Sequence, residues 1–152
     1  MDVTANHHLT TERDVSFSHY RGAEILGVVD SVDQWDESGL LARLDRRSAH
    51  RRLHLVTAAR SGLLVGYLLV DASDGLIRIV DEHLVGHADE DGRIAARLTD
   101  LAIDVAASPW GDVRVARTSL TLPHLLREGW HPVPDGSRRP EHDLTLSGAG
   151  VL

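Results

Sequence analysis

The stretch that decides the fold is Leu76 to Ala107, LIRIVDEHLVGHADEDGRIAARLTDLAIDVAA. Its first part, Leu76–Val80, is aliphatic and β-branched and predicts a largely buried strand. Its last part predicts an amphipathic helix, because apolar residues recur at three-to-four-residue spacing along one stripe. The stripe consists of Ile94, Leu98, Leu101, Ala102 and Val105. Ser108-Pro109 ends the helix, since proline lacks the amide hydrogen that would continue it.

A polar loop, GHADEDGR at residues 86–93, joins this strand to this helix. Such a loop delivers the open first turn of a helix beside the end of a strand, and the backbone amides that gather there often hold phosphate or carbonyl groups. Asp89, Glu90 and Asp91 also allow a structural interpretation, because an aspartate caps free amides and negative charge complements the helix dipole. The sequence leaves both interpretations open.

The composition predicts one domain with a proper core. The chain has 152 residues, of which 42% are hydrophobic, enough to bury a sizeable interior. No apolar run approaches the ~20 residues that cross a membrane. Residues 1–13 are polar and contain no apolar signal segment, so we expect a flexible lead into a cytoplasmic protein. We expect the domain itself over residues 14–147 and a flexible tail at residues 148–152.

Residue usage excludes several kinds of chemistry. The chain has no cysteine, which excludes disulfides, thiolate nucleophiles and cysteine-ligated zinc. All 16 basic residues are arginine, a usage typical of GC-rich bacterial genomes, and the absence of lysine excludes Schiff-base chemistry and P-loop phosphate binding. The net charge of −7 argues against a general nucleic-acid binder. No Gly-x-Ser-x-Gly elbow is present, which argues against the common hydrolases.

The remaining segments predict further strands and helices in a defined order. Asp14–Tyr20 alternates apolar and polar residues and predicts a first strand. Two helices follow, at Ala23–Trp35 and from Leu40 to Arg52; the basic end of the second, residues 46–52, is either a solvated helix terminus or a docking patch for an acidic or phosphorylated partner. Strands are expected at Leu53–Arg60, Leu63–Asp71, Asp112–Arg117, Trp130–Val133 and, as a closing edge strand, His142–Leu146, with a short helix at Leu122–Gly129.

This order of elements resembles the GNAT superfamily, whose members are acyl-CoA-dependent N-acyltransferases. The resemblance covers roughly Asp14 to Val133. Its best local match is LPHLLREGW at Leu122–Trp130, which is similar to the family's short helix ending in Gly-aromatic; HLVGHADEDGRIAARL at His83–Leu98 stands where the family carries its acyl-CoA-binding signature. The resemblance implies an α/β fold of the α+β type: a single GNAT-like domain with a mixed, mostly antiparallel sheet of about six or seven strands and about four flanking helices.

The signature departs from the family pattern. In the family this loop reads Arg/Gln-x-x-Gly-x-Gly/Ala, and its amides wrap the pyrophosphate of coenzyme A. Glu90, Arg93 and Ala95 occupy the three defined positions here, and only Ala95 fits. A glutamate repels a pyrophosphate, and an arginine adds bulk where the backbone must come close. The resemblance implies that acetyl-CoA or another acyl-CoA is held by Leu84, Val85, Gly92, Arg93, Ile94 and Ala95.

The resemblance also implies a general base on the strand before the loop and a proton donor on the last short helix. Asp81 and Glu82 lie on that strand, and because alternation sends adjacent side chains to opposite faces, at most one reaches a shared cleft. We favour Glu82, with a merely polar strand end as the alternative. Leu125 takes the family's tyrosine position, so the candidate donor is His124, with an exposed early-helix histidine as the alternative. Tyr67 is expected to pack in the core or across strands.

Three functions remain open. The first is a GNAT-like acyltransferase that moves an acetyl or other acyl group from coenzyme A to an amine of a small molecule or peptide. The second is a GNAT-fold protein that has lost coenzyme A use, as a repurposed small-molecule enzyme or a non-catalytic binding module. The third is a structural module that forms a homodimer through strand edges near the C-terminus. No metal is expected, because His83 and His87 lack further ligands, and neither nucleic acid nor membrane is an expected partner.

Overall fold

The structure is a computed structural model that describes residues 7–30, 52–73, 76–85, 92–106, 112–116, 118–133 and 143–148. Several predicted features lie outside these residues. They are the helix from Leu40 with its basic end, except Arg52, most of the polar loop at residues 86–91, and the turn at residues 134–140.

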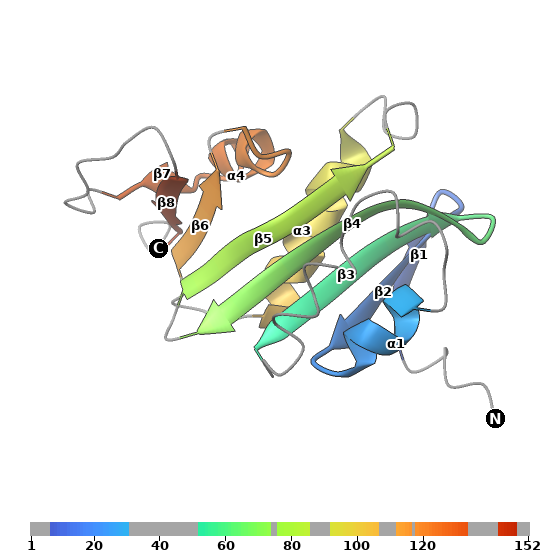
Figure 1. The fold of residues 1–152 in the computed structure, drawn as a ribbon. Helices are drawn as coiled ribbons and strands as arrows, with labels where there is room; N and C mark the ends of the chain where they lie inside the picture. Colours follow the sequence, from blue (N-terminus) through green and yellow to red (C-terminus); the bar gives the residue numbers. More distant parts are fainter. Residues whose placement is uncertain are drawn as a thin grey trace.

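One mixed sheet dominates the fold (Figure 1). Its order is β1-β2-β3-β4-β5-β6-β8-β7, and all neighbours are antiparallel except β5 and β6, which are parallel. The strands are β1 His8–Glu12, β2 Val15–Arg21, β3 Leu53–Arg60, β4 Leu63–Ser73, β5 Leu76–Leu84, β6 Asp112–Ala116, β7 His131–Pro132 and β8 Asp143–Ser147. The predicted class, a single α+β domain with a mostly antiparallel sheet, is confirmed.

Three helices are present in the described residues, and two of them cover opposite faces of the sheet. They are α1 Glu24–Asp30, α3 Arg93–Ala106 and α4 Leu122–Arg127. Figure 1 shows α1 in front of the sheet and α3 behind it. The larger core lies on the α3 side and includes the predicted helix stripe, whereas a smaller core on the α1 side joins Ile25 to Tyr67 and Leu69 of β4. Alternation along β4 therefore sends side chains into both cores.

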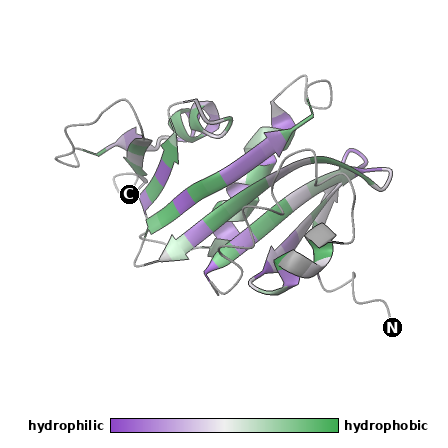
Figure 2. Cartoon of the chain, in the orientation of Figure 1, coloured by the Kyte–Doolittle hydropathy of each residue, from purple (hydrophilic) through white to green (hydrophobic). Residues whose placement is uncertain are grey.

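Hydrophobic residues follow the central strands, and hydrophilic residues gather at the hairpin tips (Figure 2). The β3–β4 tip is the two-residue link Ser61-Gly62 that the sequence predicts. Ser61 has φ 53° and Gly62 has φ 79°, as a type I′ turn requires. This turn fixes the register of β3 against β4, so the three-strand meander β3–β4–β5 follows from local sequence.

The N-terminal strand β1 was not predicted, because His8–Glu12 lies within the segment expected to be a flexible lead. Its side chains are mostly exposed and polar, so hydrophobic alternation gives no signal. Pairing comes from the backbone ladder to β2, and an ion pair between Arg97 of α3 and Glu12 ties the strand to the helix. This strand raises the number of strands to eight, against the six or seven expected.

The sequence predicts the C-terminal strand β8 as an edge strand. In the structure it lies between β6 and β7 instead. Leu146 is fully buried and pairs with Val113 of β6 on one side and with Pro132 of β7 on the other. The edge position belongs to β7, where Pro132 lacks the amide hydrogen that an inner strand would need. The long-range insertion of β8 leaves no local signal in the sequence.

A V-shaped gap separates β5 from β6. The two strands pair only where they begin, between Leu76–Arg78 and Asp112–Arg114, whereas β5 continues to Leu84 along β4. The β4–β5 ladder shifts register between Leu69 and Val70, and such a bulge increases local twist. Figure 1 shows the two strands diverging toward their ends. Among the described residues, the far half of β5 therefore keeps one unpaired edge.

Gly66 of β4 lies against this half of β5, and a side chain there is expected to be costly. An added Cβ would come 2.9 Å from Leu84 Cδ1, 3.0 Å from the His83 carbonyl oxygen and 3.4 Å from Leu98 Cδ1. We expect Gly66→Ala to lower the free energy of unfolding by about 1–3 kcal/mol, measured by urea denaturation. Gly27→Ala in α1 is the control, because nothing lies within 4 Å of its Cβ and alanine favours helices by up to about 1 kcal/mol. Equal effects of the two substitutions would contradict this packing.

Candidate functional site

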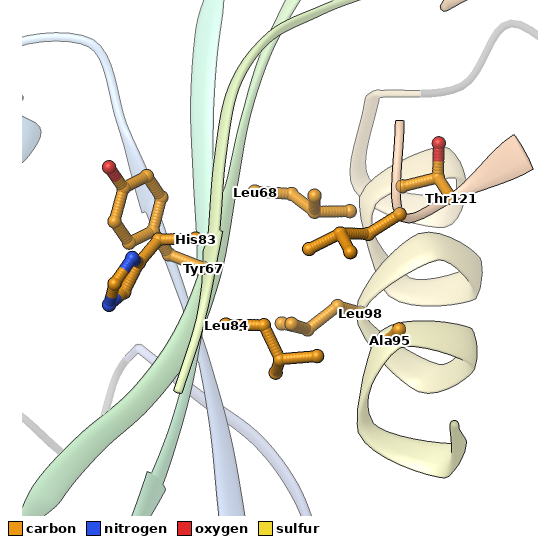
Figure 3. A pocket seen from close by; sticks show the side chains of 8 residues that line it. Tyr67, Leu68, His83, Leu84, Ala95, Leu98 and Thr121 are labelled. Carbon is orange, nitrogen blue, oxygen red and sulfur yellow. The ribbon is translucent and has the colours of Figure 1, made fainter. Parts of the chain in front are cut away.

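A small hollow with a cavity volume of about 10 Å³ lies beside the gap, between the sheet and α3. Figure 3 shows the side chains of Leu68 and Leu84 of the sheet facing Leu98 and Ala95 of α3, with Thr121 on the same side of the sheet. Leu120 also lines the hollow. Its lining is almost wholly apolar, and a cavity of this size holds about one water molecule.

The open edge of β5 turns particular peptide groups toward the gap. The Val85 N–H donates to the Val65 carbonyl oxygen at 2.8 Å, which fixes the phase of the antiparallel ladder. Residues 81, 83 and 85 therefore bond to β4, and the peptide groups of Glu82 and Leu84 face away from it. The Glu82 N–H is taken by Asp81 Oδ1 at 3.0 Å. The Leu84 peptide is left facing the gap.

The Glu82 side chain spans the gap. Ser119 Oγ donates to Glu82 Oε2 at 2.8 Å, and the Leu120 N–H donates to the same carboxylate at 3.1 and 3.2 Å. Ser119 Oγ also lies 2.8 Å from Thr121 Oγ1, and because the serine proton points to the carboxylate, Thr121 is the donor of that bond. Ser119 and Thr121 are buried. No motif in the sequence indicates this bridge, because its ends are 37 residues apart.

Asp81 lies on the opposite face of β5 from Glu82, as alternation predicts. Its Oδ2 accepts a hydrogen bond from the Tyr67 hydroxyl at 2.9 Å. Tyr67 is 1% exposed, so the expectation that it packs in the core is confirmed. The Tyr67 ring stacks on the His83 ring with centroids 5.7 Å apart. Asp81, Tyr67 and His83 therefore form one polar group on the α1 face.

His124 lies on α4 with its ring directed at α3. It is 8% exposed, and its Nε2 lies 2.8 Å from Asp100 Oδ1. The alternative interpretation as an exposed early-helix histidine is therefore wrong, because α4 packs that residue against α3. Asp100 lies on the polar side of the α3 pattern, so no motif links it to His124. The pair joins the two helices, and a catalytic role for His124 remains a prediction.

The predicted phosphate-binding turn is described only from Gly92 onward. Gly92 has φ 72°, a left-handed conformation that suits glycine, and α3 begins at Arg93. Arg93 is exposed, Ile94 is buried, and Ala95 lines the hollow. The turn thus lies at the end of β5 as the sequence predicts, while Glu90 lies outside the described residues.

A pair of histidines forms a second titratable cluster on the sheet. His19 Nε2 lies 3.0 Å from His54 Nδ1, and the two rings stack. Burial lowers the pKa of His54 to about 4, with further lowering by His19 and Arg21. Burial also lowers the pKa of His19. The two residues are 35 positions apart, and only the pairing of β2 with β3 brings them together.

Two further features follow from the described part of the chain. It contains no group of three or more histidine, cysteine, aspartate or glutamate side chains that could hold a metal ion. It also contains no helix long and apolar enough to cross a membrane.

Comparison with solved structures identifies the fold. An acyl-CoA N-acyltransferase from Pseudomonas aeruginosa superposes with a TM-score of 0.56 at 16% identity, covering 87% of this chain and 97% of that one. An acetyltransferase from Agrobacterium tumefaciens gives 0.52 at 15% identity, covering 91% and 92%. A GNAT-family protein from Desulfovibrio desulfuricans gives 0.52 at 13% identity, covering 88% and 96%. No protein-family model and no curated protein sequence matches the chain.

The class that the structure defines is thus a GNAT fold in a single α+β domain. These solved structures superpose on this domain over 87–91% of the chain. At such low sequence identity the likeness concerns the fold, because function resides in the site and not the scaffold.

Proposed function

We propose that this protein is an N-acyltransferase that moves an acetyl or other acyl group from coenzyme A to an amine of a small molecule or peptide. The observation that carries the proposal is the unpaired edge of β5, which lies beside an apolar hollow and leads to the first turn of α3. The similar structure from P. aeruginosa is that of an acyl-CoA N-acyltransferase, which supports the proposal that the gap between β5 and β6 binds an acyl-CoA.

The edge of β5 suits the pantetheine arm of coenzyme A. This arm is a thin chain with two amide groups, and an exposed strand edge binds extended amides through its own peptide groups. The Leu84 peptide faces the gap, and Val85 continues the chain toward the loop. The thioester end then lies beside the leucine-lined hollow.

The first turn of α3 is proposed to receive the pyrophosphate. Gly92, Arg93, Ile94 and Ala95 form this turn, and the partial positive charge of a helix N-terminus favours an anion. The exposed guanidinium of Arg93 adds a full positive charge in the place of the family's glycine. Glu82 as a general base would have to exchange its bonds to Ser119 and Leu120 for the substrate amine.

Calorimetric titration with acetyl-CoA tests the proposal. We expect micromolar affinity, about −8 kcal/mol, and we expect Ala95→Glu to weaken binding by about tenfold or more, because Ala95 lines the hollow and a carboxylate repels the pyrophosphate. Ala96→Glu is the matched control: it adds the same charge to the same turn, about 100° further round the helix. Equal weakening by both variants would contradict the proposed position of the ligand.

A second candidate is a GNAT-fold protein that no longer uses coenzyme A. Two observations favour it: Arg93 replaces a glycine of the signature, and Glu82 already fills the gap with bonds to the opposite arm. No detectable heat with acetyl-CoA or free coenzyme A at near-millimolar concentration would favour this candidate and contradict the first. A cytoplasmic location and a homodimer remain predictions under either candidate.

A further inference from the structure

We propose that His83 is the base that accepts the proton of the substrate amine, and that Tyr67 is the positioning residue that holds its ring. This inference rests on the proposed acyl transfer and assigns within it a residue other than Glu82 or Asp81. It starts from the two faces of β5. Figure 3 shows His83 and Tyr67 on one side of the sheet, with Leu68, Leu84 and Leu98 on the other.

The two carboxylates on this strand are already engaged. Glu82 accepts hydrogen bonds from Ser119 and from the Leu120 amide. Asp81 accepts hydrogen bonds through both oxygens, from the Tyr67 hydroxyl and from the Glu82 amide. These hydrogen bonds hold both carboxylates in fixed orientations.

The His83 imidazole has a different environment. Its ring is half-buried and lies on the Tyr67 ring with an interplanar angle of 30°. No residue that the structure describes forms a hydrogen bond with its nitrogens. Tyr67 is fixed in turn, because it is 1% exposed and its hydroxyl is bonded to Asp81. His83 is thus held in place through its ring face, while its nitrogens stay open to a substrate.

The two faces of the sheet also differ in polarity, and each suits a different one of the two substrates. The α3 face offers leucines, which suit the apolar part of an acyl thioester. The α1 face offers an imidazole, a phenol hydroxyl and a carboxylate, which suit an amine. Tyr67 and His83 are also among the residues that border the hollow, but their side chains lie on the opposite side of the sheet from Leu84 and Leu98 (Figure 3). A donor on one side and an acceptor on the other would meet at the end of β5.

The chemical step balances without a further reactant. The amine nitrogen forms a bond to the thioester carbonyl carbon, and the carbon–sulfur bond breaks with its electron pair on sulfur. The proton that leaves nitrogen moves to an imidazole nitrogen of His83. The thiolate then takes a proton from solvent, and the imidazolium releases one to solvent. Imidazole suits this step, because histidine is the side chain that most often serves as a general base in enzymes.

The test uses the full chain and begins with acetyl-CoA alone. Ring resonances of His83, assigned with a His83→Gln variant, are followed by NMR during titration with acetyl-CoA. A shift of the His83 ring supports the inference. Binding that shifts α3 amides but leaves the His83 ring unchanged overturns it and leaves the proposed function intact. Absence of any binding refutes the proposed function, and the inference with it.

Turnover then tests the role itself, with thiol release from acetyl-CoA measured against a panel of primary amines. We expect His83→Ala to lower kcat/KM for the amine by about 10²–10⁴-fold, to leave the Kd of acetyl-CoA unchanged, and to regain activity when imidazole is added. A purely structural role would not give rescue by imidazole. Wild-type rates in His83→Ala, or a comparable loss confined to Glu82→Gln, would overturn the assignment.

Discussion

Leu98→Ala is expected to lower the free energy of unfolding by about 2–5 kcal/mol, the cost of a large cavity in a core. Leu98 is 2% exposed and lies where α3 meets the sheet beside the hollow. The loss is a large fraction of the 5–15 kcal/mol that stabilises an ordinary domain. Urea denaturation of both proteins measures it.

Leu126→Ala is the matched control for this substitution. Leu126 lies on α4 and is 46% exposed, so the same change in side chain should alter stability by no more than about 0.5 kcal/mol. If the two variants lost similar stability, α3 would not be packed on the sheet as described. The described packing beside the hollow would then be wrong.

Acid is expected to weaken the fold through His54. Burial lowers the pKa of His54 from 6.5 to about 4, so between these pH values the unfolded chain binds a proton that the folded chain does not. Stability therefore falls as the pH falls through this window, whereas above pH 6.5 both states are neutral and the residue contributes no change. The full loss is on the order of 2–3 kcal/mol.

Urea denaturation at pH 7 and pH 4.5 measures this dependence. We expect His54→Leu to be clearly less sensitive to acid than the wild type, because the leucine fills the buried position without a titrating group. Arg21, Asp71 and His19 are present in both proteins, so the difference between the two isolates His54. His131→Leu on the exposed strand β7 should leave the acid sensitivity unchanged. A His54→Leu variant as acid-sensitive as the wild type would refute the assignment.

The parts of the fold that follow from local sequence were predicted well. The Ser61-Gly62 link fixes the β3–β4 hairpin, and the apolar stripe of α3 packs on the sheet as expected. Strand β1 was missed because its pairing rests on the backbone ladder and the Glu12–Arg97 ion pair. The place of β8 was wrong, because strand order depends on contacts between distant segments that alternation does not encode.

The relative position of β5 and α3 followed from the sequence, whereas the contacts of the polar residues beside them did not. The end of β5 and the first turn of α3 lie together, since a strand and the helix that follows it are neighbours. The partners of the polar residues could not be foreseen, because Glu82–Ser119 and Asp100–His124 join segments that only the folded sheet and helices bring together. The sequence suggested His83 only as a metal ligand. Its proposed role as a base rests on the Tyr67 ring, on which it stacks.

A crystal structure of the protein with acetyl-CoA tests the central claim most directly, namely that the gap between β5 and β6 is an acyl-CoA site. The account predicts the pantetheine arm along the open edge of β5 with a hydrogen bond to the Leu84 peptide, and the pyrophosphate at Gly92–Ala95. Acetyl-CoA bound elsewhere, or a gap still spanned by Glu82 and empty at near-millimolar ligand, would contradict it.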